Sequence, residues 1–254
     1  MRRSGAAALS VLVCSLLAVT GCTGDEAAPA PPAATVVAST TWVGALAKAA
    51  GADDVHVVAP ANIPDPAGFT PTAADLAPAG KAEHVLYAET DGFAVALREA
   101  AGKAHLVPVK PGNTLPEIRA AVTALGEVLG TQAAAATWLK SFESQVNGLS
   151  YSLRGSAPIP PSTAVAAADV AAWAPFAGAK VVATYGPGPA TGAALTALVA
   201  KKPKLLLASV HHPNDVPRIP GAIRVDLVNY PGADLDLLAV FETNGDRLSA
   251  TFTM

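Results

Sequence analysis

Two adjacent histidines, His211 and His212, stand in the segment SVHHPND directly after a predicted strand. Neutral imidazole is a common metal ligand, and it titrates near neutral pH. Neighbouring residues in an extended chain point in opposite directions, so at most one of the pair is expected to face a ligand. Three carboxylates near other predicted strands, Asp226, Asp169 and Glu89, would supply further ligands to a metal. The alternative is a solvated pair of loop histidines at the end of a strand.

Two further segments, YAETDGF and STTW, follow predicted strands in the first half of the chain. Glu89 and Asp91 of the first segment would supply carboxylates to a ligand, or would form a solvated turn. Thr40 and Thr41 of the second segment would bind a ligand through hydroxyl and backbone N–H groups, or would cap the following helix.

Aromatic residues make up only 5% of the chain, so those near predicted loops are candidates for lining a ligand cleft. Each candidate has the alternative of packing in the core, where most buried aromatics lie. The candidates are Trp42, Phe69, Trp173, Tyr185 and Tyr230.

The sequence favours a binding protein over an enzyme. It contains no Gly-x-Ser-x-Gly elbow, no His-Glu-x-x-His motif and no P-loop. Only a cluster of Ser, His and Asp in the cleft would favour a hydrolase. The formal net charge of −3 and the lack of a basic patch argue against a nucleic-acid partner.

The elements that must position these residues alternate along the chain. Segments rich in β-branched residues alternate with segments rich in Ala and Leu, which predicts an α/β fold with parallel sheets. We expect an N-terminal α/β lobe over residues 35–114 and a C-terminal α/β lobe over residues 155–254. Ligands in open α/β sheets bind outside the carboxyl ends of the strands, so the ligand is expected in a cleft between the lobes.

Residues 115–154 form the longest helical stretch and are expected to link the two lobes as a long helix. Apolar residues recur there at three- and four-residue steps, which marks one buried face. Gly126, Gly130 and Gly148 are the possible breaks in this helix.

The first 34 residues indicate export. A short basic start and an apolar run predict a signal peptide over residues 1–21. The segment LAVTGC resembles the bacterial lipobox, so we expect Cys22 to be lipidated and to anchor the chain on the outer side of the cell membrane. The alternative is an ordinary signal peptide with an incidental cysteine. Residues 22–34, rich in Pro and Ala, are expected to form a tether.

Two long segments, DPAGFTPTAADLAPAGKAEHVLY and GAKVVATYGPGPATGAALTALVAKKPKLLL, together with the lipobox, resemble the solute-binding lipoproteins of zinc and manganese ABC importers. The resemblance implies the cluster A architecture, in which two lobes are joined by a long linker helix. It also implies a monomer that binds its metal between the lobes and works with an ABC permease and its ATPase.

The ligand set of that family is incomplete in this chain. The family holds its metal with two or three histidines and one or two carboxylates. The first histidine would follow Asp65 and Pro66, where Ala67 stands, and the segment VKPGNTLPEI lacks the second histidine. Asp169 stands near the position of the third histidine. Asp226 matches the final carboxylate, and the resemblance makes Asp65 a cleft residue.

The expected function is therefore capture of a divalent metal, zinc or manganese, as the transported solute, with no cofactor required. The segment TLPEIRAAVTALGEVLG is similar to the helix of binding proteins for iron chelates and corrinoids, which makes a metal chelate an alternative solute. A second alternative is a surface lipoprotein that keeps the scaffold without taking part in transport.

Overall fold

The structure is a computed structural model that describes residues 35–157 and 162–252. The predicted signal peptide, Cys22 and the tether lie outside the described residues. Within the described ranges, no helix is long and apolar enough to cross a membrane.

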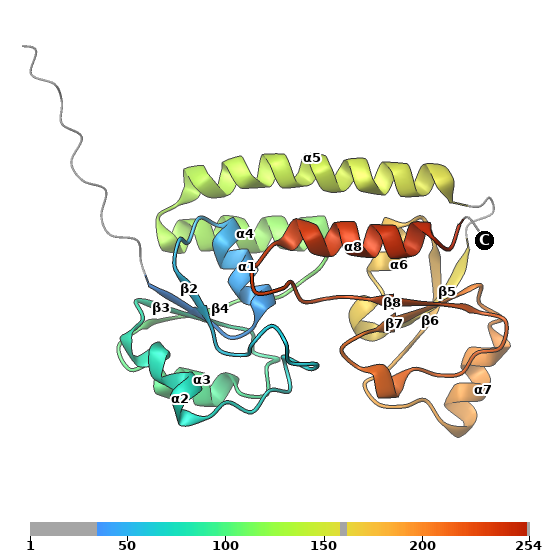
Figure 1. The fold of residues 1–254 in the computed structure, drawn as a ribbon, viewed down its shortest axis with the longest axis horizontal. Helices are drawn as coiled ribbons and strands as arrows, with labels where there is room; N and C mark the ends of the chain where they lie inside the picture. Colours follow the sequence, from blue (N-terminus) through green and yellow to red (C-terminus); the bar gives the residue numbers. More distant parts are fainter. Residues whose placement is uncertain (1–34, 158–161, 253–254) are drawn as a thin grey trace, which may run out of the picture. The chain divides into compact units, whose positions relative to one another are not determined.

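The N-terminal lobe is built on a parallel sheet of four strands in the order β2-β1-β3-β4 (Figure 1). Its inner strands, β1 and β3, are fully buried, as expected for a parallel sheet covered on both faces. A capping box between Thr72 and Asp75 starts α2. The elements are β1 (Val36–Ala38), α1 (Thr41–Ala49), β2 (Val55–Val57), α2 (Ala73–Leu76), η1 (Ala77–Lys81), β3 (His84–Tyr87), α3 (Ala94–Ala100) and β4 (His105–Pro108).

The C-terminal lobe repeats this plan with a second parallel sheet in the order β6-β5-β7-β8. The predicted α/β fold with two parallel sheets is confirmed. The elements are β5 (Thr163–Ala167), η2 (Ala168–Val170), α6 (Trp173–Phe176), β6 (Lys180–Tyr185), α7 (Gly192–Ala200), β7 (Leu205–Ser209), η3 (Pro213–Asp215), β8 (Ile223–Leu227) and α8 (Leu237–Ser249).

The link between the lobes consists of two helices rather than the single helix expected, α4 (Leu115–Leu129) and α5 (Gln132–Ser156). The break falls at Gly130, whose φ of 70° is a left-handed conformation that favours glycine at a helix end. The two helices then pack against each other, with an ion pair from Arg119 to Glu143 at 2.6 Å.

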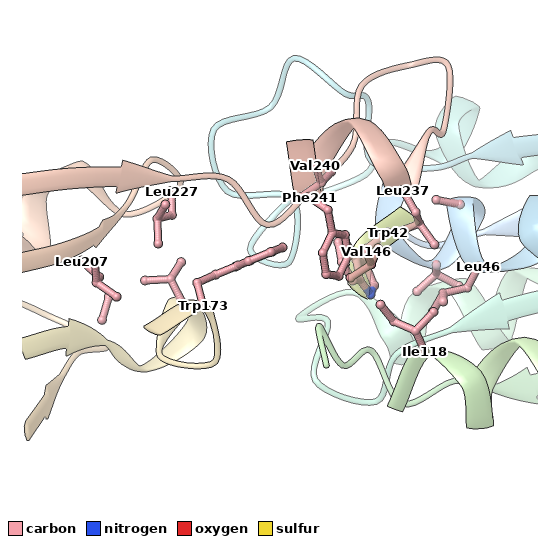
Figure 2. Close-up of a cluster of buried hydrophobic side chains, with 14 of the residues drawn as sticks. Trp42, Leu46, Ile118, Val146, Trp173, Leu207, Leu227, Leu237, Val240 and Phe241 are labelled. Carbon is pink, nitrogen blue, oxygen red and sulfur yellow. The ribbon is translucent and has the colours of Figure 1, made fainter. Parts of the chain in front are cut away.

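A single large core runs from the C-terminal lobe through the linker helices to one face of the N-terminal lobe. Figure 2 shows part of it, where Phe241 of α8 lies between Trp173 and residues of α1 such as Trp42. The rings of Trp173 and Phe241 are 4.7 Å apart. Because α8 also packs against α5 and α1, residues of both lobes share this core.

Candidate functional site

A cavity of about 280 Å³ opens where the carboxyl ends of the strands of both sheets meet. On the N-terminal side, Thr40 and Trp42 follow β1, Thr90 and Asp91 follow β3, and Asn113 follows β4. This is the position at which open α/β sheets bind their ligands.

The C-terminal lobe supplies the other wall of the cavity. Asp169 follows β5, and Asn229 and Tyr230 follow β8. The cavity is lined by no Lys, Arg or His side chain. A third carboxylate in the lining, that of Glu117, accepts hydrogen bonds from the hydroxyl and backbone N–H of Thr114 and is thereby committed to capping α4.

Two carboxyl groups, those of Asp91 and Asp169, border the cavity without a basic partner in its lining. Asp91 is only 6% exposed, and burial raises the pKa of its carboxyl above the ordinary value. One of its oxygens accepts a hydrogen bond from the Ala88 backbone N–H at 3.4 Å. Burial also raises the pKa of the Tyr230 phenol, and the charges of Asp91, Asp65 and Asp169 raise it further. A cavity with this lining favours a positively charged ligand.

Trp42 carries a buried polar group without a partner. Its side chain is 4% exposed and borders the cavity, and its indole N–H has no hydrogen-bond partner in the described part of the chain. An unpaired buried donor is costly. The nitrogen is itself buried and the ring belongs to the large core, so the N–H does not open on the cavity.

Asn229 joins several residues of the cleft through hydrogen bonds. Its side-chain amide donates to the Asp169 carbonyl at 2.8 Å and to the Asp169 carboxylate at 3.2 Å. Its side-chain oxygen accepts from the Trp173 indole at 3.2 Å and from the Asn113 amide at 3.5 Å. Because Asn113 belongs to the N-terminal lobe, the network crosses the cleft.

His211 makes a second connection across the cleft. Its Nδ1 lies 2.9 Å from the carbonyl oxygen of Pro64 in the N-terminal lobe, and its Nε2 accepts the Asn229 backbone N–H at 3.2 Å. A carbonyl only accepts, so the proton is on Nδ1, and both ring nitrogens are occupied by protein groups. Burial lowers the pKa of this imidazole, which favours the neutral form that the two hydrogen bonds require. We call Pro64, Asn113, Asp169, Trp173, His211 and Asn229 the cleft latch.

The four residues predicted to bind metal are not brought to one point. His212 borders a separate hollow of about 100 Å³ beside Tyr185. The Asp226 carboxylate pairs with Arg224 at 2.6 Å, because residues two apart on a strand share one face. Asp169 borders both this hollow and the cavity and also belongs to the latch, as does His211. Across residues 35–157 and 162–252, no group of three or more His, Cys, Asp and Glu side chains is placed to hold a metal ion.

The residues expected to line the cleft fall into two groups. Trp42, Asp91 and Tyr230 border the cavity, and the Trp173 indole belongs to the latch. The others lie elsewhere. Phe69 packs edge-on against Phe93 in a core of the N-terminal lobe, Tyr185 is buried with its hydroxyl on the Leu207 carbonyl, Glu89 is exposed, and Asp65 accepts from the Gly68 N–H in its own loop.

Two central residues, Asn113 and Asn229, were not predicted from the sequence. Asparagine is common in turns, so neither side chain stands out in a loop. The available signal was position, since Asn229 stands two residues after the end of β8, where ligand-binding groups are expected.

A larger groove of about 630 Å³ lies beside α5. Its lining mixes apolar residues such as Phe176 and Phe241 with polar ones such as Ser150 and Arg154. The smaller cavity is the better candidate site because it combines buried polar groups with the carboxyl ends of the strands.

Comparison with known proteins supports the fold. No family model and no curated protein matches this chain. Among solved structures, the chain is similar to the periplasmic zinc-binding protein TroA of Treponema pallidum, with a TM-score of 0.64, 16% identity, and coverage of 87% of this chain and 99% of that one. The chain has the cluster A solute-binding fold.

Two further structures with this fold are similar to the chain. The laminin-binding protein Lbp of Streptococcus pyogenes matches with a TM-score of 0.66, 15% identity, and coverage of 87% of this chain and 99% of that one. The solute-binding protein FpvC of Pseudomonas aeruginosa, in complex with Ni²⁺, matches with a TM-score of 0.63, 14% identity, and coverage of 86% and 95%. The resemblance noted in the sequence is thereby confirmed at the level of the fold, and the ligand must be argued from the site itself.

Proposed function

We propose that this chain is the extracytoplasmic, lipid-anchored solute-binding protein of an ABC importer and that it captures a positively charged solute between its lobes. Bound solute would be delivered to a membrane permease driven by its ATPase. The observation that carries the proposal is the cavity at the strand ends, lined by Asp91 and Asp169 and by no basic side chain.

Divalent metals are the first solutes to test, because similar structures bind zinc, nickel and manganese. Zinc requires about four converging N, S or O ligands. The described residues supply no such group of side chains, so the cavity favours a cation larger than a bare ion. Its volume of about 280 Å³ lies below the usual range of drug-sized pockets, about 300–1,000 Å³, and does not favour a bulky chelate such as a siderophore or a corrinoid.

A second candidate function is a surface lipoprotein that keeps this scaffold without transport. Two observations favour it. The latch joins the lobes through protein groups alone, and one similar structure is that of a laminin-binding protein.

The test is thermal unfolding of the purified protein after chelation, with zinc, manganese, nickel or small organic cations added back. A ligand that binds only the native state stabilises it by about 2.7 kcal/mol at a hundredfold excess over Kd. We expect at least one cation to raise the midpoint of unfolding in the wild type and to lose this effect in Asp169→Asn. If no cation raises the midpoint, the importer proposal fails and the surface-lipoprotein candidate is favoured.

A further inference from the structure

Two histidines stand side by side in the sheet of the N-terminal lobe, at the end opposite the cavity. His84 is the first residue of β3 and His105 the first residue of β4, and the two are register partners in this parallel pair. We propose that they bind one divalent transition-metal ion, such as copper, nickel or zinc, at a site separate from the cleft. This site lies at the amino ends of the strands, whereas the cavity lies at their carboxyl ends.

The spacing of the two rings suits a shared ion. Register partners on neighbouring strands project from the same face of a sheet, on strands about 4.8 Å apart. The centroids of the His84 and His105 rings are 5.5 Å apart. An ion about 2.0–2.1 Å from one nitrogen of each ring, at a tetrahedral angle, places the two centroids roughly 5 Å apart. The pair therefore has nearly the spacing that a chelate of two imidazoles requires.

The ring nitrogens of this pair are not used by the fold. Nδ1 of His84 is buried without a hydrogen-bond partner, and Nε2 lies 3.8 Å from the carboxylate of exposed Glu83, too far for a hydrogen bond. His105 is exposed, and its ring makes no hydrogen bond within residues 35–157 and 162–252. His211 differs in both respects, since protein groups occupy both of its nitrogens.

The protonation state of His84 also suits a metal. Burial lowers the pKa of its imidazole, and the charge of His105 lowers it further, whereas the charge of Glu83 opposes this shift. The fold therefore favours the neutral ring, which is the form that binds a metal ion.

The metal must be one that two imidazoles are able to hold. The described residues place no group of three or more His, Cys, Asp and Glu side chains around an ion, so water would complete the coordination. Imidazole suits copper, nickel and zinc, and the affinity of a given site rises from manganese through nickel to copper and falls at zinc. We therefore expect copper(II) to bind most tightly and manganese(II) to bind most weakly.

Calorimetric titration of the purified, untagged protein with copper(II), nickel(II), zinc(II) and manganese(II) tests the proposal. We expect the tightest site to take one copper ion per chain. His105→Ala changes an exposed residue, so the variant should fold, and its copper affinity should fall about tenfold or more because the second ligand acts within the same molecule. His56→Ala is the matched control, since His56 is an exposed histidine on β2, at the other edge of the same sheet. Its affinity should stay within about twofold of the wild type.

NMR of the same titration locates the ion. Copper(II) is paramagnetic and broadens the signals of nearby amides. We expect the amide signals of His84 and His105 to weaken first, and that of Asn229 in the cleft to weaken last.

Three outcomes would overturn the proposal. If copper affinity is unchanged in His105→Ala, the histidine pair is not the site. If the Asn229 signal weakens first and binding is lost in Asp169→Asn, the ion lies in the cleft, which overturns this site and supports the proposed function. If no metal binds at a saturable site, the pair binds none, and capture of a cation in the cleft is then decided by its own unfolding test.

Discussion

The two parts of the cleft use polar groups in opposite ways. In the latch, both ring nitrogens of His211 and both polar atoms of the Asn229 side chain have protein partners. In the cavity beside it, the buried Asp91 carboxyl has no positive partner among the lining residues. Satisfied buried groups stabilise a fold, whereas a buried carboxyl without a positive partner costs stability.

The largest loss of stability is expected when Asn229, the centre of the latch, is removed. Asn229→Ala would leave the Trp173 indole N–H without its acceptor, in a side chain that is only 1% exposed. It would also remove the hydrogen bonds that Asn229 makes with Asn113 and Asp169. We expect a loss of about 2–4 kcal/mol in the free energy of unfolding. Urea unfolding measures it. Asn147→Ala, an exposed amide on α5, should cost less than about 0.5 kcal/mol, and equal losses in the two variants would contradict the role of Asn229.

Removing the second connection across the cleft should have a smaller effect. His211→Leu loses the hydrogen bonds to Pro64 and to the Asn229 backbone, with an expected cost of about 1–3 kcal/mol in the free energy of unfolding. His212→Leu is the matched control, since no side-chain hydrogen bond is found for His212 in the described chain. The same variants sharpen the question of metal binding. If zinc stabilises the wild type and fails to stabilise His211→Leu folded to the native state, His211 is a ligand rather than part of the latch.

The latch should also weaken in mild acid. Burial lowers the pKa of His211, and the charge of His212 lowers it further. The hydrogen bond to the Pro64 carbonyl and the charges of Asp169 and Asp65 oppose this shift by raising the pKa. The neutral ring therefore contributes fully to the free energy of unfolding above the unfolded pKa of about 6.5. This contribution is lost as pH falls from there through the lower pKa of the folded state.

Urea unfolding between pH 7.5 and 5 would measure this dependence. We expect the wild type to lose more stability than His211→Leu over that range. Burial lowers the pKa of His84 as well, so part of the dependence should persist in the variant. Parallel profiles for the two proteins would contradict a neutral His211 in the latch.

The smallest effect is expected in the cavity, and its sign is reversed. The fold raises the pKa of Asp91, so its ionised form costs stability at every pH above the folded pKa. Asp91→Asn should therefore gain about 0.5–1 kcal/mol in the absence of ligand, as is common where a binding site is held in an unfavourable state. The midpoint of urea unfolding at pH 7 measures this gain. A loss of stability would show that Asp91 supports the fold rather than the ligand.

The sequence predicted the framework because its physical signals are local. Buried β-branched runs and Ala-rich segments gave the two parallel sheets, and Gly130 was among the expected breaks in the linker. The linker is broken at only one of its three expected breaks, and its apolar face continues through the turn because both helices pack on the same core. Composition alone does not separate one long helix from a helical pair.

The site was predicted only in part because it depends on contacts between distant segments. Trp42, Asp91 and Asp169 were identified from their position after strands. The partners of His211 were not, since Pro64 lies 147 residues away in the chain and offers only a backbone carbonyl. Asp226 could have been assigned to Arg224, because the pattern Arg-x-Asp on a strand places both on one face.

The most direct test of the latch is an NMR titration of the uniformly ¹⁵N-labelled protein with zinc. The account predicts that the His211 ring keeps its proton on Nδ1 throughout the titration, because both of its nitrogens have protein partners. A zinc-dependent change in the His211 ring nitrogens would contradict it and return the site to a metal centre.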